Sequence, residues 1–309
     1  MNHQHGEAGR GNRALALLKR PEELAGIEEL NLDGCRLVNL PKEIGLLTHL
    51  RTLSLYDNGL RRLPKGVWRL EQLVTLNVSV NRLTAVDEAI GQLKQLQMLD
   101  LGHNRLTALP DSLGAMQDLA FLYASNNRLT ALPDALRTAQ RLAYLNVTGN
   151  RLTRLPEWIG ELAGLTELRV YGNGLVRLPD GIGRLAGLLE LHAMKNRLER
   201  LPDSLSGLAG LRRLDLESNR LTQLPESLGG MTSLTDLNLR FNQLTSLPES
   251  VGSLKYLRFL DLRANRLASI PDSLSKLRGL EKLDLRWNRL RTLPAWFSRL
   301  QARGCVIYA

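Results

Sequence analysis

The sequence predicts a solenoid built from stacked repeats, and three observations support this prediction. Asparagine recurs every 23 residues from Asn58 to Asn288, without an insertion or a deletion between copies. These asparagines lie in the pattern L-x-x-L-x-L-x-x-N-x-L, which is followed by L-P-x-x-[IVLF]-x-x-L. A unit of this length cannot bury its apolar face alone, so neighbouring units must stack around one continuous core.

The N-terminal part, residues 1–26, precedes the first repeat. Residues 1–11 are polar and predict a disordered tail. Residues 12–20 predict a short helix, because Asn12 is a suitable N-cap and the apolar residues cluster on one helical face. Pro21 ends this segment, which we expect to cap the first turn of the core.

The repeats themselves occupy residues 27–302 as twelve units of 23 residues. Unit three replaces the usual Leu-Pro with Val86-Asp87, so we expect its convex turn to differ from the others. Residues 303–309 predict a closing thirteenth strand. Val306 and Tyr308 would occupy the places of strand leucines in that strand.

The positions within a unit have distinct roles when its first leucine or isoleucine is numbered 1. Positions 1, 4, 6, 11, 14, 18 and 21 are apolar and are predicted to point inward. The asparagine at position 9 also points inward and therefore needs hydrogen-bond partners, which the backbone of adjacent turns can supply. Positions 3, 5 and 7 alternate with buried positions 4 and 6, so they face solvent.

The repeat pattern resembles that of leucine-rich repeat proteins. It is similar to the 23-residue, LP-containing subclass found in Ras-suppressor-like proteins, plant intracellular Ras-group proteins and many bacterial proteins. The resemblance implies an α/β leucine-rich-repeat solenoid, a right-handed horseshoe with a parallel sheet on the concave face and an extended or short-helical convex side. It also implies a protein-binding role, with a small GTPase or another signalling protein as a candidate partner.

Two groups of residues on the predicted concave face are candidates for partner binding, because aromatic and arginine residues dominate interface hot spots. The central patch comprises Met98, Phe121, Tyr123, Tyr144, Tyr171, His192 and Met194. The arginine ladder comprises Arg240, Arg263 and Arg286 at position 7, bordered by Phe241 and Trp287. Two simpler explanations remain open: strand aromatics pack against cross-strand neighbours, and the ladder arginines pair with nearby aspartates.

A third group, the arginine ridge, occupies position 10, directly after the ladder asparagine or, in the first unit, after Cys35. Its members are Arg36, Arg82, Arg105, Arg128, Arg151, Arg197, Arg220, Arg266 and Arg289. They nearly account for the net charge of +10 and could bind a polyanion. Lys or Arg is common at this place in the family's repeats, which favours a solvated structural column. Nucleic acid is not expected, because no recognised nucleic-acid motif accompanies the ridge.

The sequence offers no site for catalysis, a metal or a cofactor. There are only two cysteines and five histidines, and no nucleophile–base set can be separated from the repeat residues. No apolar stretch approaches the length of a membrane span, and the N-terminus lacks a signal-peptide core. We therefore expect a non-enzymatic, monomeric module in the cytoplasm that binds a protein partner. A signalling scaffold is a candidate role for it. The alternatives are a bacterial effector that binds a host protein in the host cytosol and a polyanion binder.

Overall fold

The structure is a computed structural model. It describes residues 16, 18, 20–24 and 26–309. The tail predicted for residues 1–11 lies outside the described residues. Most of the helix predicted for 12–20 also lies outside them, although Ala16 and Leu18 have helical backbone. Leu18 is buried, as a residue packing on the first turn of a core should be.

The chain forms two compact units, Met1–Arg151 and Leu152–Ala309, and each is described by itself. In the first unit the strands are β1 (Glu29–Asn31), β2 (Thr52–Ser54), β3 (Thr75–Asn77), β4 (Met98–Asp100), β5 (Phe121–Tyr123) and β6 (Tyr144–Asn146). The 3-10 helices are η1 (Pro21–Leu24), η2 (Lys42–Leu46), η3 (Lys65–Arg69), η4 (Glu88–Gln92), η5 (Asp111–Ala115) and η6 (Asp134–Thr138).

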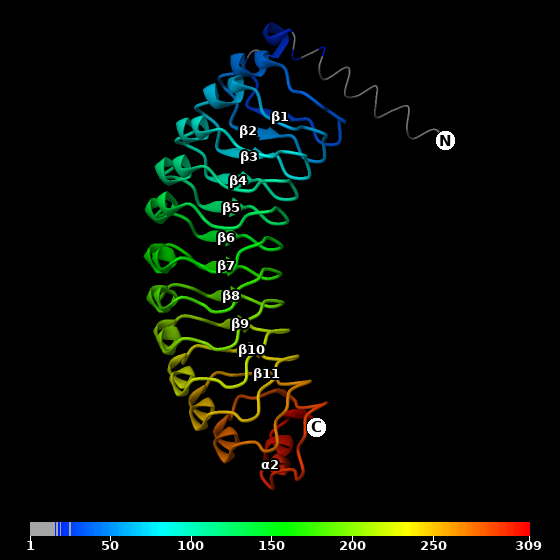
Figure 1. Ribbon diagram of the computed structural model, residues 1–309, viewed down its shortest axis with the longest axis vertical. Helices are drawn as coiled ribbons and strands as arrows, with labels where there is room; N and C mark the ends of the chain where they lie inside the picture. Colours follow the sequence, from blue (N-terminus) through cyan, green and yellow to red (C-terminus); the bar gives the residue numbers. More distant parts are fainter. Residues whose placement is uncertain (1–15, 17, 19, 25) are drawn as a thin grey trace, which may run out of the picture. The chain divides into compact units, whose positions relative to one another are not determined.

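The second unit repeats this alternation. Its strands are β7 (Glu167–Arg169), β8 (Glu190–His192), β9 (Arg213–Asp215), β10 (Asp236–Asn238), β11 (Phe259–Asp261), β12 (Lys282–Asp284) and β13 (Val306–Tyr308). Its helices are η7 (Glu157–Glu161), η8 (Asp180–Arg184), η9 (Asp203–Gly207), η10 (Glu226–Gly230), η11 (Glu249–Ser253), η12 (Asp272–Lys276) and α2 (Phe297–Ala302). Figure 1 shows the succession of strands in chain order within each unit.

The sheets are parallel, and the repeat length sets their register. Leu99 of β4 pairs with Leu122 of β5, which pairs in turn with Leu145 of β6, each one repeat further along the chain. These three leucines have no exposed surface. In β2 to β12 the central residue is buried, and the residues on either side point to the opposite face of the sheet. The predicted repeat solenoid is thus confirmed within each unit.

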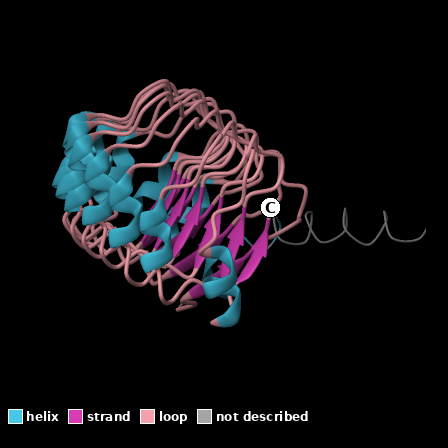
Figure 2. Cartoon of the chain, turned by 90° about the horizontal axis from the view of Figure 1, so that it is seen from below, coloured by secondary structure: helices cyan, strands magenta, loops and turns pink. Residues whose placement is uncertain are grey.

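Short 3-10 helices lie on the opposite side of each unit from the strands, as Figure 2 shows. Most are preceded by the proline of the Leu-Pro pair in extended conformation, for example Pro110 with φ −69° and ψ 145°. The expectation for unit three was wrong: Asp87 adopts the same conformation and caps η4 by accepting a hydrogen bond from the Ala89 N–H at 2.9 Å. No helix among the described residues has the length and apolar character needed to cross a bilayer.

The ladder asparagines connect successive repeats through buried hydrogen bonds. The Asn104 amide donates to the carbonyls of Val78, one repeat earlier, and Leu101, at 3.0 and 3.1 Å. Its side-chain oxygen accepts from the Leu83 N–H at 2.9 Å. One side chain therefore satisfies backbone groups of two repeats, which explains why a polar residue is kept inside the core.

The last strand differs from the sequence prediction by one residue. β13 pairs Lys282 with Val306 and Leu283 with Ile307, so Ile307 takes the leucine place. Val306 and Tyr308 are therefore exposed instead of buried. The extra residue lies in the segment that contains α2 and Gly304, whose φ of 93° is readily accessible only to glycine. A slip of one residue turns every side chain of a strand to the other face.

Candidate binding surface

The solvent-facing side of the strands, formed by positions 3, 5 and 7, is called the sheet face below. In the first unit it carries an aromatic cluster on β5 and β6. The Tyr123 and Tyr144 rings have centroids 4.7 Å apart, and those of Phe121 and Tyr144 are 6.5 Å apart. Met98 pairs with Phe121 across the sheet. Four residues of the predicted central patch therefore form one cluster, and 43% of Phe121 remains exposed.

The remaining three residues of that patch lie in the second unit. Tyr171 and Met194 are half-buried, while His192 on β8 is only 7% exposed. His192 does not continue an apolar surface. Its Nε2 lies 2.9 Å from a Glu190 carboxylate oxygen and 4.0 Å from Glu167, so it belongs to a charged group.

Two arginines complete the charged group around His192. Arg169 pairs with Glu167 at 2.5 Å, and Arg213 lies 3.5 Å from Glu190. Burial raises the pKa of Glu190, but the hydrogen bond from His192 and the positive charges of Arg213 and Arg169 outweigh it, and the net shift is downward. The group is thus arranged to keep Glu190 ionised.

The same histidine and glutamates also have the composition of a cation site. The ligand atoms of Glu167, Glu190 and His192 all lie within 4.8 Å of one another, and carboxylate and imidazole are ligands that divalent metals accept. Arg169 and Arg213 already compensate both carboxylates. A bound cation would have to compete with these guanidinium groups.

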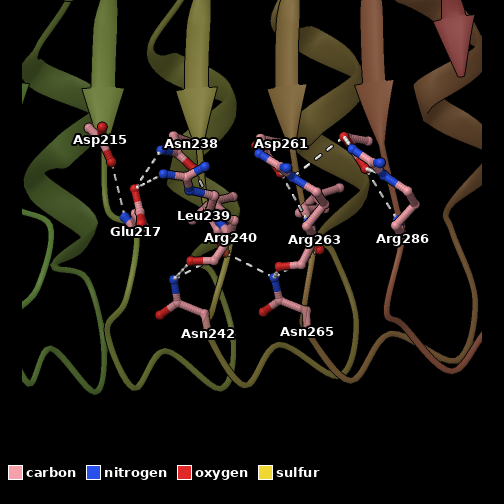
Figure 3. Close-up of polar contacts among 12 residues, drawn as sticks. Asp215, Glu217, Asn238, Leu239, Arg240, Asn242, Asp261, Arg263, Asn265 and Arg286 are labelled. Atoms are coloured by element: carbon pink, nitrogen blue, oxygen red, sulfur yellow. Dashed lines mark hydrogen bonds and ion pairs between the residues drawn. The ribbon is translucent and has the colours of Figure 1, made fainter. Parts of the chain in front are cut away.

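The predicted arginine ladder lies just after the ends of β10, β11 and β12, and its charges are compensated within the chain (Figure 3). Arg240 pairs with Glu217 at 2.6 Å. Arg263 lies 2.6 Å from Asp261 and 3.4 Å from Asp284. Arg286 pairs with Asp284 at 2.7 Å. The ladder is therefore a network of carboxylate–guanidinium pairs.

Asp284 is the most deeply buried member of this network, with 1% of its side chain exposed. Burial raises its pKa, but hydrogen bonds from Arg286 and the charge of Arg263 more than offset this effect and lower it. The pairing in turn raises the pKa values of Arg263, chiefly through Asp261, and of Arg286, chiefly through Asp284. These interactions hold the network charged.

An exposed aromatic group borders the network. Phe241 and Trp287 are 47% and 65% exposed, and their stacked rings have centroids 6.4 Å apart. Both have left-handed backbone, with φ of 55° and 63°, which is costly for a bulky side chain. The Arg286 guanidinium lies 5.9 Å from the Trp287 ring and 4.8 Å from the Tyr308 ring.

Two features of this region were missed by reasoning from the sequence. Tyr308 joins the surface because β13 is shifted by one residue, and no sequence signal predicted that shift. Pairing of the ladder arginines with nearby aspartates was left open by the sequence, but the burial of Asp284 between two arginines was not predicted. The alternating Asp at position 5 and Arg at position 7 was the signal that could have revealed it.

Comparisons with known proteins agree on the repeat family. A leucine-rich repeat region model matches residues 136–247, and a leucine rich repeat model matches 25–83, 71–129 and 255–302. A leucine-rich repeat protein of Leptospira interrogans is 30% identical, with a TM-score of 0.65, over 92% of this chain and 84% of that chain. No curated protein matches the sequence.

Two further solved structures are similar. The plant peptide hormone receptor RGFR1, in complex with RGF2, is 28% identical with a TM-score of 0.62, over 84% of this chain and 51% of that chain. An internalin of Listeria monocytogenes has a TM-score of 0.71 at 20% identity, over 96% of this chain and 93% of that chain, and shows the fold alone. The repeats, the strand register and these matches lead to one conclusion: the chain belongs to the leucine-rich repeat proteins.

Proposed function

We propose that the protein is a non-enzymatic module that binds a protein partner on its sheet face. Leucine-rich repeat folds generally mediate protein–protein interaction, and the solved complex of RGFR1 with RGF2 supports a polypeptide ligand. The observation that carries the proposal is the placement of exposed aromatic side chains on and beside the sheet face. Aromatic residues are enriched at the energetic centres of interfaces.

Two anchor regions are proposed, one in each unit. In the first, Phe121, Tyr123 and Tyr144 offer a continuous aromatic surface. In the second, Phe241 and Trp287 offer the apolar contact, and the ladder arginines are the polar contact beside it. Tyr171, His192 and Met194 remain candidate contacts, although the charged group around His192 suits a polar ligand better than an apolar one.

Rigid display is the proposed mechanism. Each anchor side chain starts from a strand or turn fixed by backbone hydrogen bonds to neighbouring repeats, such as Phe121 N–H to the Gln97 carbonyl at 2.9 Å. Because the surface is ordered before the partner arrives, little conformational entropy is lost on docking. The resemblance to Ras-suppressor-like proteins supports a small GTPase or another signalling protein as the partner, with this chain as a monomeric cytoplasmic scaffold.

The proposal is tested by affinity capture with three baits and mass spectrometry of the captured proteins. The native chain is compared with a variant carrying Tyr123→Ala and Tyr144→Ala, and with a variant carrying Phe241→Ala and Trp287→Ala. We expect a protein that the native chain retains and that at least one variant loses. Circular dichroism establishes that each bait is folded.

Tyr256→Ala is the matched control, because this tyrosine is 67% exposed but lies outside the strands. It should retain the partner at the native level. Identical captures by the native chain and both sheet-face variants would contradict the proposed site. A partner lost equally with the Tyr256 variant would place binding elsewhere.

A further inference from the structure

The arginine ridge differs in its surroundings from the ladder arginines, and its longest uninterrupted run lies in the first unit. This run comprises Arg82, Arg105, Arg128 and Arg151. All four side chains are exposed, and within the described residues none of them has an ion-pair partner. Each follows a ladder asparagine and precedes a buried leucine, so the four project from equivalent points of successive turns.

None of the four arginines forms an ion pair with an acidic residue in the described part of the chain, although Asp57 lines the same surface pocket as Arg82. No Asp or Glu lies within four residues of these arginines on either side in the sequence. The turns that carry them stack directly, because the Arg105 N–H donates to the Leu83 carbonyl and the Arg128 N–H to the Leu106 carbonyl, both at 2.8 Å. The arginines are therefore about one strand spacing apart, roughly 4.8 Å, and like charges at this distance repel.

A column of hydroxyl groups accompanies the arginines. Thr84, Thr107 and Thr130 stand two residues after Arg82, Arg105 and Arg128, separated from them by a buried leucine. These threonines are exposed and have no side-chain hydrogen bond within the described residues. Each of these turns thus offers one guanidinium and one hydroxyl group toward solvent, a donor set suited to an oxyanion.

The composition of the run restricts the class of ligand. Every member is Arg and none is Lys, which favours bidentate contact with tetrahedral oxyanions. No Phe, Tyr or Trp lies within four residues of the run, so it offers no aromatic platform for stacking bases. A single file of donors matches a linear polymer better than a planar membrane surface. These features favour a chain of closely spaced oxyanions that carries no bases.

We infer that the run Arg82–Arg151 is a binding site for a linear polymer of phosphate groups, namely inorganic polyphosphate. This inference goes beyond the proposed protein-binding function and uses a different surface. Neutralisation by the polymer removes the repulsion between stacked arginines. The contacts are ionic, so counterion release should make the affinity strongly dependent on salt.

Fluorescence anisotropy with labelled long-chain inorganic polyphosphate tests the inference. For about four phosphate contacts, the dissociation constant should rise about 50-fold between about 50 and 200 mM salt. A variant in which all four arginines become glutamine should bind about tenfold more weakly or worse. The variant carrying Phe241→Ala and Trp287→Ala should bind as the native chain does, which separates this site from the proposed protein-binding surface.

The matched control changes Arg51, Lys65, Arg69 and Arg137 to glutamine, because these exposed residues of the same unit lie away from the run and have the same total charge. It should keep most of the affinity, and circular dichroism checks that both variants fold. Equal losses of polyphosphate affinity in the two quadruple variants would show that only net charge matters, and would overturn the inference. Absence of binding, or tighter binding of heparin or duplex DNA at equal charge, would overturn it as well.

Discussion

Two columns of arginines, one in each unit, differ in whether carboxylates neutralise their charge. In the second unit, the ladder arginines after β10–β12 are paired with Glu217, Asp261 and Asp284. In the first unit, the run from Arg82 to Arg151 has no carboxylate partner among the described residues. The repeat spacing is the same in both. What differs is the local partner: Asp at position 5 precedes two ladder arginines, whereas asparagine and leucine flank the ridge arginines.

The largest expected effect comes from removing the buried carboxylate of the paired column. Asp284→Ala removes a buried carboxylate together with its two hydrogen bonds from the Arg286 side chain, and we expect the free energy of unfolding to fall by about 3 kcal/mol. Urea denaturation measures the change. Asp215→Ala is the control, because the Asp215 side chain accepts a backbone hydrogen bond from Glu217 and has no arginine partner in the described structure. A loss no greater than that of the control would mean that the network is not structural.

Acid should weaken the paired column. The native pKa of Asp284 is lowered below the unfolded value of about 3.9, so its stabilisation is complete above that value and is lost as the pH falls through the native pKa. At neutral pH the free energy of unfolding of the native protein should therefore exceed that of the Asp284→Asn variant by about 2 kcal/mol. This difference should shrink below about pH 4. Urea denaturation across this range measures it. A constant difference would contradict the assignment.

Removing one arginine of the network should have a smaller effect. Arg286→Gln leaves Asp284 with Arg263 at 3.4 Å, and 42% of the Arg286 side chain is exposed to screening solvent. We expect the free energy of unfolding to fall by clearly less than it does for Asp284→Ala. A double-mutant cycle with Asp284→Asn should give a coupling of similar size. Additive effects of the two changes would show that the pair does not interact energetically.

The smallest effect is expected from a single ridge arginine. Arg128→Gln removes an exposed side chain that has no ion-pair partner within the described residues, so the free energy of unfolding should change by less than about 0.5 kcal/mol. The same urea experiment measures it. A loss above about 1 kcal/mol would make the ridge a structural column and remove the contrast with the ladder.

The repeated parts of the fold could be predicted from the sequence because one packing rule acts at every repeat. The buried leucines of β4, β5 and β6 pair as the 23-residue period requires. Where the 23-residue pattern is interrupted, it no longer predicts which side chains are buried. The segment from α2 to Gly304 contains one extra residue, which places Tyr308 on the outer face of β13. Asp87 stands where other repeats have proline, and its side chain caps the helix that follows.

The candidate surface could be predicted only in part. Solvent-facing positions follow from strand alternation, which placed Phe121, Tyr123 and Tyr144 together. Whether a charged side chain faces a ligand or a neighbouring residue depends on its rotamer and on the residues two places away. That is why the ion pairs of Arg263 and the contacts of His192 with two glutamates required the structure.

The asparagine ladder has a consequence for hydrogen exchange. The Leu106 amide is bound by the Asn127 side chain of the following repeat at 2.9 Å, while the Asn127 amide donates to the Leu101 carbonyl of the preceding one at the same distance. The Leu106 proton can exchange with solvent only when two adjacent turns separate. Protection of these leucine amides from hydrogen exchange therefore measures the separation of one repeat from the next. Each leucine amide that is bound by a ladder asparagine reports local unfolding at one junction between repeats.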